Sequence, residues 1–169
     1  MSYDKVRITD EVAEYIDSSV LCWLATVSGD GVPNVSPKEA FVVSGEGRIL
    51  VANIASPQSI RNIQDNNKVC LSFVNVFVQK GYKVSGEAAI VREDESRFPD
   101  LLEILTALIG NTFRIVSIIE ITPNKIDQII APSYRVFPES TELDRIRESL
   151  GTYAVADYQK RLDQGLEEP

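Results

Sequence analysis

The sequence predicts a mainly β protein with peripheral helices, in which six antiparallel strands close into a barrel. About six strand-like apolar runs alternate with short turns, and connections this short favour antiparallel pairing. An open sheet of this kind has two unpaired edges, and closing into a barrel removes them. No repeat, low-complexity block or linker divides the 169 residues. We therefore expect one domain over residues 1–169, with a barrel core at about 10–130 and a C-terminal helical extension at about 139–169.

The first predicted elements are a helix and a hairpin. Thr9 can cap a helix over residues 10–18. The apolar run over residues 20–27 predicts a buried strand. An Asp-Gly pair in the turn 28–31 predicts a tight hairpin, because these residues tolerate the positive φ that such turns require.

The next strand runs over residues 32–43 and contains two prolines. Pro33 and Pro37 have no N–H to donate to a neighbouring strand, so part of this strand should lie at an edge or a bulge. Glycines in the turn 44–47 end it, and a further apolar strand finishes near Ile54.

Helices and strands continue to alternate in the rest of the chain, with β-branched and aromatic residues in the strands and leucines at helical spacing in one helix. The predicted elements are a short helix from residue 57 to a stop at 66–67, a strand over 69–78 interrupted at 80–81, a strand over 82–91, a helix over 95–109, a strand over 113–121, a turn at 123–124, an apolar run over 126–130, and a last helix from residue 139.

Composition excludes several classes of function. The net charge of −8 argues against non-specific binding to nucleic acid or to an anionic membrane, since both need a basic face. The absence of histidine excludes a Ser-His-Asp triad, a Cys-His pair, an HExxH zinc site and a histidine-ligated haem. Cys22 and Cys70 are too few for a four-cysteine metal site and are expected to be buried free thiols, so we expect no metal and a cytoplasmic location. If the protein is an enzyme, an organic cofactor should supply the chemistry.

Residues 56–62 predict a site for a phosphate-bearing cofactor. They follow an apolar strand and open a helix, with Ser56 suited to the N-cap and Pro57 to the first helical position. The free N–H groups and the dipole of such a helix end attract anions, and Ser59 and Arg61 add a hydroxyl and a cation. The alternative is an ordinary capped helix that joins two strands.

Three passages, in this order and at this spacing, resemble the flavin-binding split barrel of the pyridoxamine 5′-phosphate oxidase-like superfamily. They are residues 24–38, which include the DG turn and Ser36-Pro37-Lys38, residues 51–69, and residues 77–88. The resemblance covers about residues 10–130. It implies a split β-barrel that binds flavin mononucleotide (FMN) at the interface of a homodimer, and a small-molecule substrate or electron donor.

Matched residue by residue, the resemblance also implies which residues bind the flavin. These are Val35, Ser36, Pro37 and Lys38 beside the ring and ribityl chain, Asn53 and Ile54 as a continuation of that wall, Ser56 and Ser59 on the phosphate with Lys38 or Arg61 supplying charge, and Lys80 and Tyr82 on the flavin of the neighbouring subunit. For Lys80, a solvated lysine that protects an edge strand remains an alternative.

The chain departs from the pyridoxamine phosphate oxidases themselves. It lacks histidine and a basic C-terminal motif, and Gln58 stands where many relatives have a lysine. We therefore expect a flavin-dependent oxidoreductase of another substrate, with no catalytic residue identified. Two alternatives stay open: a protein that binds, stores or senses flavin without turnover, and a deazaflavin-dependent reductase on the same fold. Haem-degrading relatives usually need a histidine ligand and are disfavoured.

Overall fold

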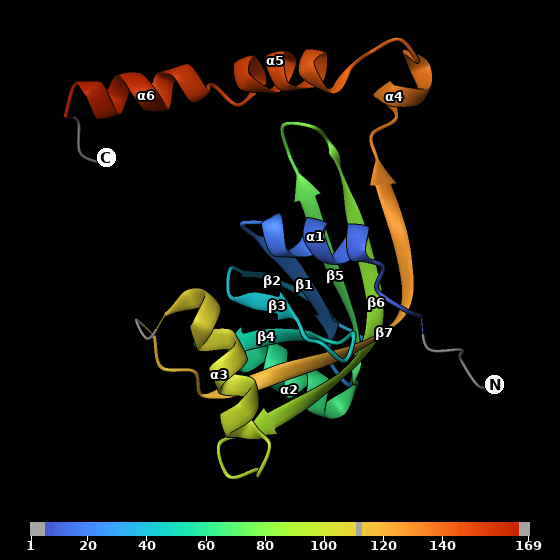
Figure 1. Ribbon diagram of the computed structural model, residues 1–169, viewed down its shortest axis with the longest axis vertical. Helices are drawn as coiled ribbons and strands as arrows, with labels where there is room; N and C mark the ends of the chain where they lie inside the picture. Colours follow the sequence, from blue (N-terminus) through green and yellow to red (C-terminus); the bar gives the residue numbers. More distant parts are fainter. Residues whose placement is uncertain (1–5, 111–112, 166–169) are drawn as a thin grey trace. The chain divides into compact units, whose positions relative to one another are not determined.

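A single seven-stranded sheet, with helices at its periphery, is the main feature of the molecule (Figure 1). The computed structural model describes residues 6–110 and 113–165, without the side chains of 108 and 109. The strand order across the sheet is β2-β1-β5-β6-β7-β4-β3. In chain order the elements are α1 (Asp10–Ser18), β1 (Cys22–Val27), β2 (Pro33–Lys38), β3 (Phe41–Val43), β4 (Ile49–Asn53), α2 (Pro57–Asp65), β5 (Lys68–Asn75), β6 (Lys80–Arg92), α3 (Phe98–Ile109), β7 (Ser117–Ile130), α4 (Ser133–Val136), α5 (Glu142–Thr152) and α6 (Val155–Asp163).

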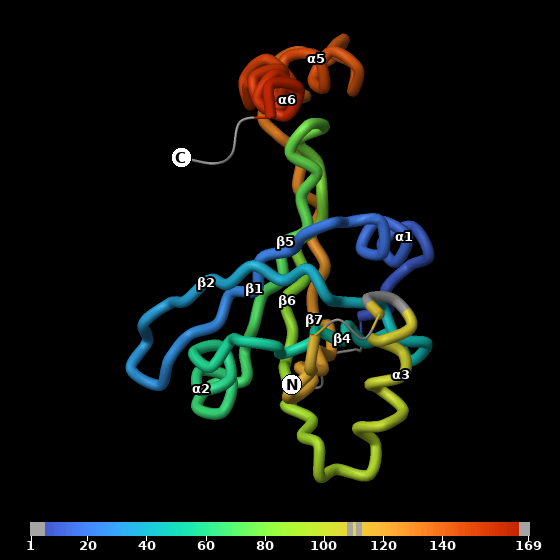
Figure 2. Tube along the Cα trace, turned by 90° about the vertical axis from the view of Figure 1, so that its left-hand side faces the viewer, coloured from blue at the N-terminus to red at the C-terminus, as the bar shows by residue number. Residues whose placement is uncertain are grey.

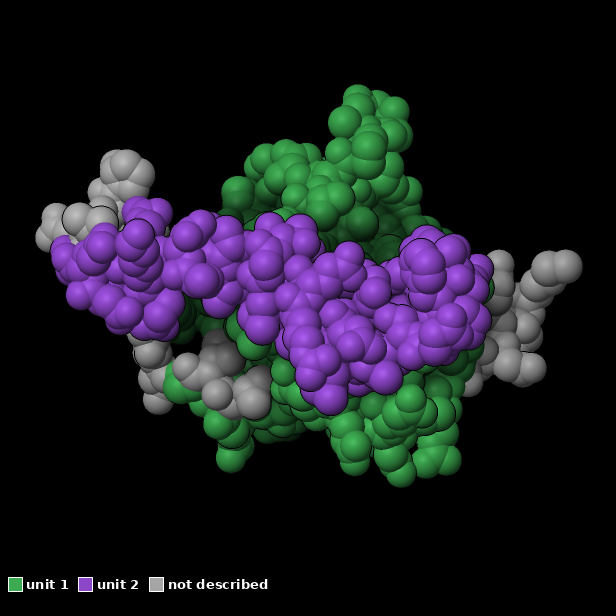
Figure 3. Space-filling view, turned by 90° about the horizontal axis from the view of Figure 1, so that it is seen from above, with its two compact units in different colours: residues 1–74, 81–128 green, residues 75–80, 129–169 purple. Residues whose placement is uncertain are grey.

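The chain divides into two compact units (Figure 3). The first comprises residues 1–74 and 81–128, and the second comprises residues 75–80 and 129–169. The second unit includes α5 and α6 in place of the single last helix predicted, because Ala154 has a left-handed conformation (φ 51°) that separates them. The prediction of one domain stays a prediction. Among the described helices, none has both the length and the apolar character needed to cross a membrane.

The sheet has seven strands where six were predicted, because the run over residues 32–43 forms two strands. β2 ends at Lys38 and β3 begins at Phe41, yet these strands occupy opposite ends of the strand order. Three residue steps span at most about 11 Å. The edges of a flat seven-stranded sheet would lie about 29 Å apart, at about 4.8 Å per strand. The sheet must therefore curve until its edges approach each other, which confirms the predicted split-barrel class.

Three of the described prolines lie within strands: two in an edge strand, as predicted, and one, Pro123, in an inner strand where a turn was predicted. Pro33 and Pro37 lie in β2, which is the terminal strand of the sheet. The predicted turn at Pro123 is wrong, because β7 continues through it. Strand β4 pairs with β7 only along residues 117–121, so Pro123 lies beyond that pairing and its missing N–H breaks no hydrogen bond to β4.

Gly81 lies inside β6 rather than in a break between strands. The interruption comes earlier, at residues 76–79, where Gln79 has a positive φ of 60°. A Cβ atom on Gly81 would lie 1.9 Å from the backbone oxygen of Phe73. Glycine is therefore required here by the close approach of two backbones.

Strand β4 is buried on both faces and separates two apolar clusters. Ile49 and Val51 belong to the cluster inside the barrel, and Leu50 and Ala52 belong to the cluster under α3. Because side chains alternate along a strand, one short strand serves both clusters. The barrel cluster also contains Val12, Ile16, Leu24, Leu71, Phe73, Val84, Ile119 and Ile121, and the other contains Val91, Phe98, Leu105, Ile115 and Ile118.

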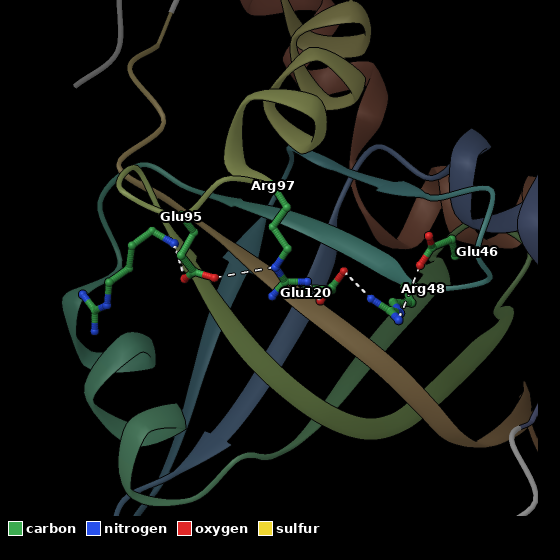
Figure 4. A network of polar contacts seen from close by, with 6 residues as sticks. Glu46, Arg48, Glu95, Arg97 and Glu120 are labelled. Carbon is green, nitrogen blue, oxygen red and sulfur yellow. Dashed lines mark hydrogen bonds and ion pairs between the residues drawn. The ribbon is translucent and has the colours of Figure 1, made fainter.

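Glu120 in β7 is a buried carboxylate held by two arginines (Figure 4). Arg48, just before β4, donates to its Oε1 over 2.8 Å, and Arg97, just before α3, donates to its Oε2 over 2.6 Å. Burial by itself raises the pKa of this carboxyl, but the hydrogen bonds and the positive charges of the two guanidinium groups together outweigh burial and lower the pKa of Glu120 below its ordinary value. This network ties β7 to the starts of β4 and α3.

Candidate functional site

Strand β2 presents a row of polar side chains on one face. Because side chains alternate along a strand, Asn34, Ser36 and Lys38 share this face. Val35 and Pro37 lie on the opposite face, where Val35 is 58% exposed. The predicted stretch of Val35, Ser36, Pro37 and Lys38 therefore contributes side chains to both faces of the strand.

Helix α2 begins against this polar row. It contacts β1 and β2, and Figure 2 shows it next to the hairpin that these strands form. Ser56 is the N-cap residue and Pro57 is at the start of the helix, as predicted. The Ser56 hydroxyl makes no capping hydrogen bond to the helix. The backbone N–H groups of Gln58 and Ser59 belong to the first turn, which has no preceding carbonyl groups to accept from them.

Lys38 places a buried positive charge at this helix start. Its Nζ donates to the Ser36 hydroxyl over 2.8 Å and to the Ser56 hydroxyl over 2.5 Å, and the residue is 6% exposed. Among the described residues, no carboxylate oxygen lies within 4.0 Å of Nζ. Burial lowers the pKa of the Lys38 ammonium below its ordinary value. The site therefore contains a desolvated cation with only neutral partners.

Cys22 lies directly across from Lys38 in the β1–β2 pairing. It is fully buried, and burial raises the pKa of its thiol to about 12, despite the nearby ammonium. A thiol with this pKa stays protonated at neutral pH, so Cys22 fills the core and is not a nucleophile.

Asn53, at the end of β4, orients the segment that leads into α2. Its Oδ1 accepts from the Ser56 backbone N–H over 3.1 Å, and its Nδ2 donates to the Ser117 hydroxyl over 2.9 Å. Both Asn53 and Ser117 are buried. The Asn53 side chain thus positions Ser56 by accepting from the Ser56 backbone N–H.

A second group of polar residues joins α2 to the barrel and was not predicted. Asn62 Nδ2 donates to the Thr26 hydroxyl over 3.0 Å, and Asn34 Nδ2 donates to the same hydroxyl over 3.2 Å and to the Ser59 hydroxyl over 3.5 Å. Ser59 is 1% exposed. Strand alternation from Ser36 could have indicated Asn34, but Thr26 and Asn62 come from other elements and no local pattern connects them.

A cavity of about 440 Å³ opens beside Lys38 and Ser56. Its size is within the range of small-molecule sites in proteins. The lining combines these two residues with apolar side chains and one exposed acid: Pro37, Glu39, Ala40, Ala52, Ile54, Ala55 and Phe113. The predicted residues Pro37, Lys38, Ile54 and Ser56 thus meet around one cavity, and Ser36 contacts Lys38.

Three predicted residues have partners elsewhere in the chain. Arg61 is exposed, donates to Gln58 Oε1 over 2.7 Å and lines a different cavity. Tyr82 donates its hydroxyl to Glu11 on α1 over 2.8 Å and packs edge-on against Tyr15. Lys80 belongs to the second unit and is described next.

Within the second unit, Lys80 binds the segment after β7. Its Nζ lies 2.6 Å from Glu142 Oε1 in α5 and 4.5 Å from the centre of the Tyr134 ring in α4. The Tyr134 hydroxyl donates to the Val78 backbone oxygen over 2.8 Å. These contacts hold the C-terminal helices to the turn between β5 and β6. The predicted contact of Lys80 and Tyr82 with a neighbouring subunit's flavin stays a prediction.

Comparison with solved structures places this site on a widespread fold. HupZ of Group A Streptococcus aligns with a TM-score of 0.60 and 24% identity over 72% of this chain and 93% of that chain. An FMN-binding protein from Syntrophomonas wolfei aligns with a TM-score of 0.58 and 15% identity, over 72% of this chain and 88% of that one. HutZ, a haem storage protein from Vibrio cholerae, aligns with a TM-score of 0.52 and 23% identity, over 74% and 95%. At these identities the comparison establishes the fold alone.

Sequence comparison shows the family. An uncharacterized protein of Methanocaldococcus jannaschii is 32% identical over 92 residues, which are 53% of this chain and 60% of that protein. The chain thus spans less than two-thirds of the length of this relative. The family model for pyridoxamine 5′-phosphate oxidase matches residues 8–130, which contain the whole barrel and the Lys38 cavity. The chain therefore belongs to the pyridoxamine 5′-phosphate oxidase family and has its split-barrel fold.

Proposed function

We propose that the protein binds FMN and is a flavin-dependent oxidoreductase whose substrate is a small molecule other than pyridoxamine phosphate. The observation that carries this proposal is the buried ammonium group of Lys38, which has two serine hydroxyls and no carboxylate as partners among the described residues. A desolvated cation with neutral partners is stabilised when an anion binds it.

The donors around Lys38 fit a phosphate. A phosphate dianion needs several hydrogen-bond donors and at least one cation. Lys38, the hydroxyls of Ser36 and Ser56, and the first-turn N–H groups of α2 supply them. Of the two cations predicted for the phosphate, Lys38 is the one that contacts the serines.

The apolar part of the cavity suits the flat ring of a flavin. Pro37, Ile54 and Phe113 line it next to Lys38 and Ser56. When bound, FMN would supply hydride or electron transfer, which this set of side chains does not offer by itself. The residues of the chain would bind the phosphate, orient the ring and exclude water from one face of it.

A haem function is not proposed, although one structural relative stores haem. The chain contains no histidine, the residue that most often binds haem iron through its imidazole. Cys22 is fully buried and its pKa is raised to about 12, so it is not available as a thiolate ligand.

The proposal includes a homodimer with the flavin at the subunit interface. One support is an apolar surface on the outer face of the β1–β2 hairpin, where Trp23, Val35 and Pro37 are exposed. Exposed apolar residues that gather on one strand pair are typical of an interface. In such a dimer, Lys80 and Tyr82 would lie near the partner's flavin. The free thiols of Cys22 and Cys70 support a reducing, cytoplasmic compartment.

The experiment that tests FMN binding is a titration of purified protein with FMN, followed by absorbance and fluorescence. We expect flavin absorption bands at close to one FMN per chain, and a Lys38→Met variant that binds FMN about 10- to 100-fold more weakly, because a hydrogen bond to a charged group is worth about 1.5–3 kcal/mol. Lys125→Met is the matched control, since Lys125 is exposed and pairs with Asp127. Protein that ignores FMN, or a K38M variant with wild-type affinity, would refute the site.

A second measurement separates an enzyme from a flavin-storage or flavin-sensing protein. NADH or NADPH is added without oxygen, and oxygen is then admitted. An oxidoreductase bleaches and recovers its flavin absorbance over repeated cycles, whereas a storage protein does not. A deazaflavin added in competition with FMN tests the remaining alternative, because it would displace FMN if it were the natural cofactor.

A further inference from the structure

A second cavity, of about 590 Å³, is lined by Asn53, whose neighbours Ala52 and Ile54 line the Lys38 cavity. Two arginines, Arg61 from α2 and Arg92 from the end of β6, line it. Asn53 and Ser117 also line it, and both side chains are more than nine-tenths buried. The cavity is open to solvent, and the two arginines are exposed, but these two polar side chains form a buried part of its wall.

The two arginines have no acidic partner. Among the described residues, no carboxylate oxygen lies within 4.0 Å of the Arg61 or Arg92 guanidinium. This contrasts with the other arginines of the barrel and of α5 that have ion-pair partners: Arg48, Arg97, Arg114, Arg145 and Arg147. The chain has 25 acidic residues, yet none of those described pairs with these two guanidinium groups. Both groups are therefore available to pair with an external anion in the cavity.

The acids near this cavity do not cancel its positive charge. Glu93 and Asp94 also line it, but Glu93 already accepts from Arg114 at 3.1 and 3.2 Å. Of the two acids, Asp94 alone has no ion-pair partner within the part of the chain that the structure describes, so one unpaired acid and two arginines line the cavity. The remaining wall is apolar and consists of Pro57, Ile60 and Val116.

We propose that this cavity binds a small oxyanion, a carboxylate or a phosphate, attached to an apolar body. Arg61 and Arg92 would pair with the oxyanion through their planar donor groups, and the apolar wall would contact the body. Asn53 joins this cavity to the flavin site, since its Oδ1 holds the backbone N–H of Ser56. Identifying the bound molecule as the substrate rests on the proposed function, whereas the binding site itself does not.

The test is calorimetric titration of the full-length protein with benzoate and with phenyl phosphate, each compared with acetate and inorganic phosphate. We expect saturable binding of benzoate or phenyl phosphate that is tighter than that of the ion without the apolar body. Arg92→Ala should weaken it at least about 10-fold, because a charged hydrogen-bonded pair is lost. Arg92→Lys, which keeps the charge but not the planar fork, should retain part of the affinity.

Arg161→Ala is the matched control, since Arg161 has no carboxylate partner among the described residues, lies in α6 and is not one of the residues that line the cavity. R161A should bind like the wild type. Binding that survives R92A, or that R161A weakens equally, would overturn the proposal, as would the absence of saturable binding. K38M should weaken the binding of FMN and leave that of benzoate or phenyl phosphate unchanged, and R92A should do the opposite. A protein that binds benzoate through Arg92 but never FMN would refute the proposed function and support this site.

Discussion

Lys38 should make FMN binding depend on pH. Burial lowers the pKa of its ammonium below the ordinary 10.5, so the group loses its proton at a lower pH than a free lysine. A phosphate pairs only with the charged form, so FMN affinity should fall as the pH rises through that lowered pKa. The measurement is the FMN dissociation constant, from quenching of flavin fluorescence, between pH 7 and pH 10.5.

Lys38→Arg is the control for this pH dependence. Arginine keeps its charge over the whole range, whereas every other titrating group, including the flavin, is unchanged. The ratio of the wild-type and K38R dissociation constants at each pH therefore gives the contribution of Lys38 ionisation alone. Parallel profiles for K38R and wild type would show that the ammonium does not bind the phosphate.

Ser56 and Ser59, which were predicted as a pair, should differ in their effects. The Ser56 hydroxyl accepts from Lys38, whereas Ser59 is buried against Asn34. Ser56→Ala should weaken FMN binding about 10-fold and leave the melting temperature nearly unchanged, because it removes one hydroxyl from a charged site. Ser59→Ala should lower the stability of the protein by about 1 kcal/mol, because the Asn34 amide loses a partner. Thermal melts and FMN titrations of both variants check this, and a reversed order would assign the phosphate to Ser59.

At the scale of elements, local patterns predicted most of the barrel. The DG turn at residues 28–31, the helix at 10–18 and the serine-proline start of α2 lie where the sequence places them. Each depends on residues adjacent in the chain. The split of residues 32–43 into β2 and β3 depends instead on closure of the sheet, which no local pattern carries. The predicted break at Gly81 was wrong for the same reason. Glycine is required there because the backbone of Phe73, in another strand, lies too close for a Cβ atom.

The candidate site likewise contains residues that local patterns predicted and residues that they could not predict. Ser36, Lys38 and Ser56 were predicted, and they meet because β2 and the start of α2 lie side by side. Thr26 and Asn62 were missed because their hydrogen bond joins residues 36 positions apart. Arg61 was grouped with the phosphate by its nearness in sequence, but its side chain lines the other cavity.

Glu120 should stabilise the junction of β7, β4 and α3 at neutral pH and lose this effect in acid. Its folded pKa is lowered from 4.5, so its contribution is complete above about pH 4.5 and disappears as the pH falls through the lower folded value. Glu120→Gln should cost about 2–3 kcal/mol at pH 7, because two charged hydrogen bonds weaken around a buried group. Urea unfolding at pH 7 and at about pH 3 measures the difference, which should shrink in acid.

The exposed pair Lys68–Glu87 supplies the control for this prediction. Glu87→Gln should change stability by less than about 1 kcal/mol at either pH, as is usual for surface ion pairs. Equal losses in E120Q and E87Q would mean that the Glu120 network is no stronger than a surface pair.

At the scale of the whole molecule, the apolar outer face of the β1–β2 hairpin should bring two chains together. Trp23 is 46% exposed at its centre, opposite Pro37 on one side and Ser72 on the other. Large aromatic residues of this kind contribute most of the free energy of an interface. Trp23→Glu should raise the dimer dissociation constant at least about 30-fold, which corresponds to about 2 kcal/mol.

Light scattering after size-exclusion chromatography would measure the mass of each variant over a range of concentrations, and FMN titration of the same samples would follow the site. W23E should become monomeric and lose FMN affinity at the concentration where it dissociates, since the flavin is proposed to lie between subunits. Ile104→Glu is the control, because Ile104 is an exposed apolar residue of α3 and not of the hairpin. A W23E protein that stays dimeric would show that this face of the hairpin is not the interface, and a monomer that binds FMN as tightly as the dimer would place the flavin within one chain.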